Sequence, residues 1–230
     1  MTPPHEGERP IVVCPYIARE IELNGRLEDP LWQRAAAIEL VDAVSGRPGR
    51  FSTSVRLAWS STCLYAAFIC EDDYVWGDIA EHDGPIYDQE CVEIFINPSG
   101  CHHTYFEINL SPKNVVFDAC ILNDRTAANP DGPFTGLHCW EAAGLRTAVS
   151  IQGEVDTPGA ARGWIAEYAL PFRALYGASH QPPLPGDLWR VNFYRIDSPR
   201  RGEQELYAWN PVLRPTFHLP WRFGSLRFGA

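Results

Sequence analysis

The sequence has almost no methionine and none of the short motifs that mark common enzyme families. Its only methionine is Met1, so neither a methionine-lined surface nor a methionine ligand to haem can be expected within the chain. It contains no GxSxG or HExxH motif, no phosphate-binding glycine loop and no dinucleotide-binding fingerprint. The sequence therefore predicts a protein that is not an enzyme.

The chain also lacks an excess of positive charge and a long apolar run. Its formal net charge is −10, whereas a nucleic-acid partner would require a clustered basic face. No apolar run approaches the roughly 18 residues of a membrane span, so neither nucleic acid nor membrane is expected as a partner. Residues 1–20 show no secretory signal, which predicts a cytoplasmic protein as given, or an extracellular one if the N-terminus is truncated or mis-started.

The seven cysteines show no CxxC pair and no framework-like spacing. Most lie in apolar, strand-like segments, which favours reduced thiols that act as small buried hydrophobes; one or two disulfides are the alternative. The His-Cys pairs in "CHHTY" and "LHCW" have no second partner at a zinc-like spacing. The cysteines therefore predict neither a disulfide scaffold nor a zinc site.

Short apolar runs separated by turn residues dominate the chain, and helical periodicity is scarce. This pattern predicts an all-β, single-domain antiparallel β-sandwich with one or two short helices, at 30–35 and 171–176. Residues 1–10 are expected to form a flexible N-terminal tail and residues 11–230 the domain. The expected strands are 12–14, 20–23, 53–59, 63–70, 90–97, 103–110, 114–121, 145–151, 163–169, 188–196, 206–209 and 224–228.

The stretch "YDQECVEIFINPSGCHHTYFEINL", residues 87–110, alternates apolar and polar residues over two strands and a turn. Its apolar face suits a sandwich core, whereas the other face carries Glu93, Glu107 and Asn109 beside aromatic rings. Facing strands bring side chains on one face within about 5 Å of one another. That second face is either a solvated surface or a hydrogen-bonding platform for a polyhydroxylated ligand, because carboxylates and amides bind hydroxyls and rings stack on sugars.

Two further stretches contain candidate ligand-binding residues. The aromatic, proline-rich segment "YAWNPVLRPTFHLPWRFGSLRF" includes Phe217 and His218, which either stack on a ligand or cap the core. The acidic run "EDDYVWGDIAEHDG" holds six carboxylates in residues 71–84, so it is either a solvated loop or a source of calcium ligands. The calcium candidates are Asp72, Asp73 and Asp83.

The order of these segments resembles carbohydrate-binding module family 9 and the proteins similar to it. The resemblance rests on "NGRLEDPLWQRA", "SVRLAWSSTCLYAAFICED", "DQECVEIFINP", "YFEINLSPKNVVFD", "GWIAEYALPF", "GDLWRVNFYRID", "AWNP" and "FHLPWRFGSLRF", from about residue 20 to residue 228. The blocks D-x-E-C-V-E-I-F-I and F-x-x-P-x-x-F-G-x-L, in this order and separation, are its most specific parts.

The resemblance implies a non-catalytic β-sandwich that binds the chain ends of xylan or cellulose and carries structural calcium. Members clamp a terminal sugar between two tryptophans. The positions of this clamp are Tyr87 and Phe217 here, and Glu93 matches a sugar-binding glutamate. Glu107 stands where the family uses an arginine, which reverses the hydrogen-bonding character of that position. This departure favours a sugar site whose ligand differs from a xylan or cellulose end, and a sandwich that has lost sugar binding is the alternative.

We therefore expect an oligo- or polysaccharide to be the partner, stacked between Tyr87 and Phe217. No cofactor is required, apart from the calcium that the resemblance suggests. The alternatives are a protein-interaction or accessory sandwich without a sugar ligand, a glycosidase that uses two carboxylates, and a haem redox domain. The candidate carbohydrate-binding residues are Tyr87, Glu93, Glu107, Asn109, Phe217, Asn192, Arg195, Trp76 and His218.

Overall fold

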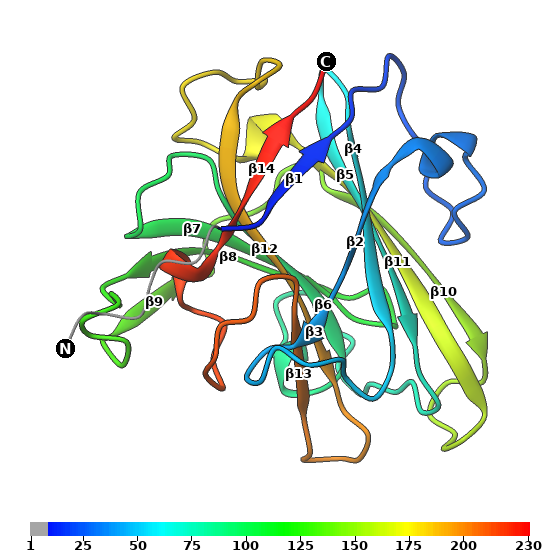
Figure 1. The fold of residues 1–230 in the computed structure, drawn as a ribbon. Coiled ribbons are helices and arrows are strands. Elements are labelled where there is room, and N and C mark those ends of the chain that lie inside the picture. Colours follow the sequence, from blue (N-terminus) through cyan, green and yellow to red (C-terminus); the bar gives the residue numbers. More distant parts are fainter. Residues whose placement is uncertain (1–8) are drawn as a thin grey trace.

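The computed structural model describes residues 9–230 and has the predicted β-sandwich architecture (Figure 1). Two sheets pack face to face, and short 3₁₀ turns and loops connect the strands. Residues 1–8 of the predicted N-terminal tail, which include Met1, lie outside the described residues. No helix in the described part of the chain is both long and apolar enough to cross a membrane.

The larger sheet carries the candidate site. Its strand order is β1-β14-β12-β6-β7-β8-β9, and β13 pairs with both β12 and β3. The β1–β14 pair is parallel, in contrast to the antiparallel pairing predicted throughout. The strands are β1 (Ile11–Cys14), β3 (Val41–Asp42), β6 (Cys91–Asn97), β7 (Thr104–Leu110), β8 (Val116–Asn123), β9 (Phe134–Leu137), β12 (Leu188–Asp197), β13 (Glu205–Ala208) and β14 (Gly224–Phe228).

The smaller sheet is antiparallel and has the order β10-β11-β5-β4-β2. Its β4–β5 hairpin follows from the sequence, because the Ser60 side chain accepts hydrogen bonds from the Thr62 and Cys63 amides and closes the predicted turn. The strands are β2 (Ala36–Glu39), β4 (Thr53–Trp59), β5 (Cys63–Glu71), β10 (Arg146–Gly153) and β11 (Ala161–Pro171).

The structure differs from the sequence-based prediction in its short elements. β2, β3 and β9 were not predicted, and the strand expected at 20–23 is absent from the described chain. Ile21 instead packs with Trp32 against the outer face of the smaller sheet. The two predicted helices are 3₁₀ turns at Pro30–Arg34 and Phe172–Ala174, and further turns lie at Ile86–Asp88 and Pro220–Arg222.

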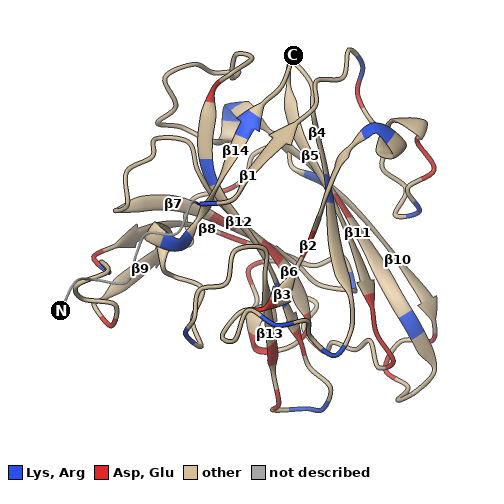
Figure 2. Cartoon of the chain, viewed as in Figure 1, with Lys and Arg blue, Asp and Glu red and all other residues tan. Residues whose placement is uncertain are grey.

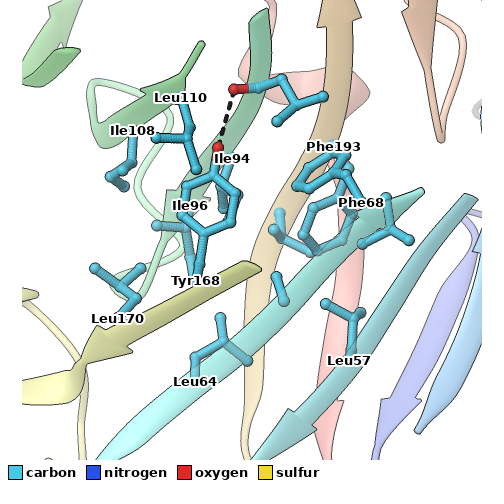
Figure 3. Close-up of a cluster of buried hydrophobic side chains, with 14 of the residues drawn as sticks. Leu57, Leu64, Phe68, Ile94, Ile96, Ile108, Leu110, Tyr168, Leu170 and Phe193 are labelled. Atoms are coloured by element: carbon cyan, nitrogen blue, oxygen red, sulfur yellow. Dashed lines mark hydrogen bonds between the residues drawn. The ribbon is translucent and has the colours of Figure 1, made fainter. Parts of the chain in front are cut away.

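The main core fills the space between the two sheets (Figure 3). From the larger sheet, Ile94 and Ile108 point into it, as the alternation of residues 87–110 predicts. The smaller sheet contributes Phe68 and Tyr168, and the Tyr168 hydroxyl donates a 3.0 Å hydrogen bond to the Val92 carbonyl in the facing sheet. This bond satisfies a polar group that would otherwise be costly to bury.

A second core lies on the other face of the larger sheet. Cys91, Phe95 and Tyr105 form its base, and Phe217 and Phe223 from the C-terminal segment cover it. The polar side chains on this face are therefore not a solvated surface, because the segment after β13 folds back over them. All seven cysteines are free thiols, five of them buried.

Candidate functional site

The β6–β7 hairpin brings the predicted polar residues together on the outer face of the larger sheet. In its antiparallel register Glu93 lies opposite Asn109, and Phe95 lies opposite Glu107. Side chains alternate along a strand, so these four residues share one face. Glu93 and Glu107 are 2% and 5% exposed, which makes them buried carboxylates rather than surface acids.

A pocket of about 380 Å³ opens above this hairpin. Its volume falls in the range of small-molecule sites, roughly 300–1,000 Å³. Five of the predicted site residues line it, namely Tyr87, Glu93, Glu107, Phe217 and His218. They come from the continuous stretch 86–110, which contains the Ile86–Asp88 turn, β6 and β7, and from the segment after β13, so two distant parts of the chain meet there.

The two predicted clamp rings are held in different ways. The Phe217 ring stacks on Tyr194 with centroids 4.1 Å apart and an interplanar angle of 12°, and Phe217 is only 7% exposed. Tyr87 is 36% exposed and packs edge-on against Phe117 at 5.0 Å. Both rings line the pocket, and no ring contact between them is found among the described residues. The Phe217 ring is therefore a pocket wall that is packed against the protein, whereas the Tyr87 ring is a pocket wall that is partly exposed to solvent.

His218 is fixed between aromatic rings. It stacks on Phe134 with centroids 3.8 Å apart, and its Nδ1 shares a 2.8 Å hydrogen bond with the Tyr105 hydroxyl. Its Nε2 lies 4.0 Å from the Glu107 carboxylate. Burial, with a smaller contribution from Arg125, lowers the pKa of His218 to about 3, so the ring is neutral at physiological pH and gives Glu107 no counter-charge.

The two carboxyls are strongly perturbed by their surroundings. Burial raises the pKa of Glu107 to about 7, against a hydrogen bond of 2.9 Å that Asn109 Nδ2 donates to its Oε1. Burial and repulsion from Glu107 hold the pKa of Glu93 well above its ordinary range, and the Cys91 thiol donates to Glu93 Oε1 at 3.4 Å. At neutral pH the pair therefore retains a proton and can both donate and accept hydrogen bonds.

Asn109 and Asn192 are buried and do not line the pocket. Asn109 orients Glu107, as described above. Asn192 donates to the Tyr194 hydroxyl and to the Asn210 carbonyl, each at 2.9 Å, and accepts from the Asn210 amide at 3.0 Å. It thereby ties the C-terminal segment to β12. The structure gives both amides a positioning role beneath the site.

Arg195 lies outside the pocket because it points to the opposite face of β12 from Asn192. Its Nη2 lies 2.6 Å from Asp72 and 3.6 Å from both Glu90 and Asp197. All four of these residues are buried. The grouping of Arg195 with Asn192 overlooked that positions 192 and 195 have opposite parity along a strand.

Trp76 also lies outside the pocket. It is 3% exposed, its Nε1 donates a 2.8 Å hydrogen bond to the Ser198 carbonyl, and the Arg201 guanidinium covers its ring at 4.5 Å. Its ring stacks on Tyr74. These contacts fix the loop after β5 and leave the ring no place at the site.

The three calcium candidates do not converge. Asp72 pairs with Arg195, Asp73 pairs with Arg50 at 2.8 Å, and Asp83 lies in a separate group with His82 and Glu141. Calcium takes six to eight oxygen ligands, whereas guanidinium groups already bind two of these carboxylates and the third lies beside an imidazole. These residues do not fit a common calcium site, so calcium binding stays a prediction from the family resemblance.

Several lining residues were not singled out in the sequence. Phe117 sits on the predicted strand 114–121 and pairs with Asn109, so strand alternation was a usable signal. Phe134 belongs to the short edge strand β9, whose four residues show no alternation strong enough to identify it. The additional lining residues include Asp88, Phe95, Phe117, Phe134, His138 and Gln204.

Comparison with known proteins assigns the family. Residues 23–229 match the family model described as carbohydrate family 9 binding domain-like. The chain belongs to this family. The family 9 domain is also 27% identical, over 183 residues, to a protein of Arthroderma benhamiae named "Extracellular protein", covering 76% of this chain and 78% of that one.

Solved structures share the fold of this family 9 domain. A protein from Bacteroides uniformis ATCC 8492 superposes with a TM-score of 0.77 at 18% identity, covering 96% of this chain and all of the other. A family 9 module from Caldicellulosiruptor kristjanssonii in complex with cellotriose superposes with a TM-score of 0.63 at 13% identity, covering 96% and 94%. Its complex with glucose gives 0.61 at 13% identity, covering 96% and 97%.

Proposed function

We propose that this family 9 domain is a non-catalytic carbohydrate-binding protein whose pocket holds one sugar ring. Tyr87 and Phe217 provide the apolar walls, and Glu93 and Glu107 bind hydroxyl groups from the floor. The family supports carbohydrate binding, and a module with the same fold binds cellotriose and glucose. The observation that carries the proposal is the convergence of these four residues around one pocket.

The chemistry of the lining suits a polyhydroxylated ring. An aromatic face packs against the C–H face of a pyranose, while a carboxylate accepts hydrogen bonds from its hydroxyls. Because the Glu93–Glu107 pair retains a proton, it can also donate one. Asn109 and Asn192 hold the floor and the covering segment in place, so little ordering is needed when a ligand enters.

Calorimetry with the Tyr87→Ala variant tests this proposal. Tyr87 is partly exposed, so its removal should leave the fold intact while affinity for a bound oligosaccharide falls about tenfold or more. The matched control is Tyr176→Ala, which removes another exposed tyrosine that does not line the pocket. Equal affinity of wild type and Tyr87→Ala for the oligosaccharide would contradict stacking of the sugar on Tyr87 and indicate a binding site outside this pocket.

The same ligand also tests for catalysis. We expect wild-type protein to leave cello-, xylo- and amino-oligosaccharides uncleaved, because the family is one of non-catalytic binding modules. Released sugars measured by chromatography after prolonged incubation would contradict this. Loss of that cleavage in Glu93→Gln would then identify a glycosidase.

A further inference from the structure

The pocket has an unbalanced negative charge. Of the described residues that line it, Asp88, Glu93 and Glu107 are acidic, and none is lysine or arginine. Figure 2 shows acidic segments around β6 and around β13, the two strands that flank the C-terminal half of β12. Asp88 is exposed at the rim, whereas Glu93 and Glu107 are buried on the floor.

Among residues 9–230, the groups that partner the two floor carboxyls are neutral. Asn109 donates to Glu107, and the Cys91 thiol donates to Glu93. His218 lies 4.0 Å from Glu107 but is neutral. Arg125 lies behind the pocket wall, where its guanidinium covers the Phe134 ring at 4.7 Å and its Nη1 donates to Thr216 Oγ1. Among the described residues it forms no ion pair with either floor carboxyl.

Without a cation, the buried pair avoids the cost of two adjacent negative charges only by retaining a proton, and a cationic ligand group could take the place of that proton. The surroundings suit such a group. The rings of Tyr87, Phe95, Phe117 and Phe217 line the same pocket, and the electron-rich face of an aromatic ring attracts an ammonium ion. The carboxyls on the floor and the aromatic rings of the walls therefore both favour a positively charged ligand group.

We propose that the sugar bound by this domain carries a free amino group, so that its ammonium lies between Glu93 and Glu107. The ligand class is an amino sugar, such as a 2-amino-2-deoxyhexose unit of an oligosaccharide. This inference rests on the proposed sugar-binding function. The pair releases its retained proton to solvent as the ligand binds, and the ammonium then donates hydrogen bonds to both carboxylates while the ring stacks against the aromatic walls. An N-acetylated sugar loses the charge, and a uronic acid adds repulsion.

The test is calorimetry on the full chain with four trisaccharides: β-1,4-linked glucosamine, its N-acetylated form, cellotriose and a uronic acid trimer. The expected order places the glucosamine trimer at least about tenfold tighter than the two neutral ones, with the uronic acid weakest. Equal affinity for charged and neutral trimers would overturn the amino-sugar inference and leave sugar binding intact. Failure of all four to bind would overturn both.

A variant separates charge recognition from general binding. In Glu107→Gln the ratio of glucosamine-trimer to cellotriose affinity should fall toward one, because the glutamine amide carries no negative charge to form an ion pair with the ammonium. Glu154→Gln is the control, since it removes one exposed negative charge from the loop between β10 and β11 and should keep the wild-type ratio. An unchanged ratio in Glu107→Gln, or an equal fall in Glu154→Gln, would contradict a specific ammonium site.

Tetramethylammonium is the final probe, because it carries the charge without a sugar ring. We expect it to compete only weakly with the glucosamine trimer, since it cannot donate hydrogen bonds to the carboxylates. Competition as strong as that of monomeric glucosamine would show that the pocket recognises a cation without a sugar, which would overturn the amino-sugar assignment.

Discussion

Two groups of buried carboxylates lie on opposite faces of the same larger sheet, and they differ in what neutralises them. Glu90 and Asp197, together with Asp72, surround the Arg195 guanidinium. Glu93 and Glu107 have an amide, a thiol and a neutral imidazole as neighbours. The first group is closed within the protein, whereas the second opens into a pocket.

This difference separates a structural role from a binding role. Arg195 is fully buried, and its Nη1 also donates to Thr53 Oγ1 at 3.0 Å and to the Glu71 carbonyl at 2.8 Å, so it links strands of both sheets. Burial still raises the pKa of Asp197 to about 6, despite the opposing effect of Arg195. A buried carboxylate is therefore not by itself a ligand site; the decisive features are a missing cation and an open pocket.

The largest expected effect is the loss of the central cation of the closed group. Arg195→Met should lower the free energy of unfolding by about 3–5 kcal/mol, because it leaves buried carboxylates without their partner. Urea unfolding measures this change. Arg227→Met, at an exposed position of β14, is the control and should be near neutral. If Arg195→Met were as stable as wild type, Arg195 would not be needed to neutralise the closed group, which would contradict the contrast between the two groups.

The second effect is a pH dependence of stability that arises in the open group. The pKa of Glu107 is about 7 in the folded protein, above its ordinary value of 4.5, so folding favours its protonated form. Its contribution is fully present below pH 4.5 and is lost as the pH rises through 7. Between about pH 5 and about pH 8, wild type should lose roughly 1–3 kcal/mol more unfolding free energy than Glu107→Gln.

Urea unfolding across this pH range measures the difference, with Glu154→Gln as the control for a lost surface charge. Burial holds the pKa of Glu93 high in both proteins, and Glu107→Gln removes only the repulsion between the two carboxyls, which adds to the difference in the same direction. The other perturbed groups around the pair remain in both proteins, so their contributions largely cancel; they are Tyr87, Cys91, Tyr105, Tyr194 and His218. Parallel pH profiles for wild type and Glu107→Gln would contradict a strained carboxyl at position 107.

The third effect contrasts the two pocket walls. Phe217→Leu should cost about 1 kcal/mol of stability, because it loses the ring stacked on Tyr194. Tyr87→Ala should change stability by less than that and affinity by more, because the Tyr87 ring is open to the ligand. Thermal unfolding and calorimetry on both variants provide the comparison. A larger stability loss in Tyr87→Ala than in Phe217→Leu would reverse the assignment of the two walls.

Strand alternation predicted the features of the fold that depend on local sequence pattern. The two-faced hairpin at 87–110 is confirmed by register and by the two core clusters. The family resemblance pointed to Tyr87, Glu93 and Phe217, which line one pocket. Strand alternation and the family motifs therefore identified the main residues of the pocket from the sequence alone.

The remaining features depend on contacts between distant segments. Nothing local in the sequence shows that residues 217–223 cover the polar face, that Phe134 stacks on His218, or that Arg195 meets Asp72 across 123 positions of sequence. The exact parity of a strand also decides which face a side chain occupies, and this is where Arg195 was misplaced. Such pairings follow from the packing of whole sheets rather than from neighbouring residues.

The most direct test of the open pocket is NMR of protein labelled with ¹³C at the glutamate carboxyl carbons. During titration with the glucosamine trimer, the signals of Glu93 and Glu107, assigned through their glutamine variants, should shift and saturate together. The signal of Glu90, in the closed group, should stay in place and serves as an internal reference. No shift of Glu93 or Glu107 at saturating ligand, or a shift of Glu90 alone, would contradict the account.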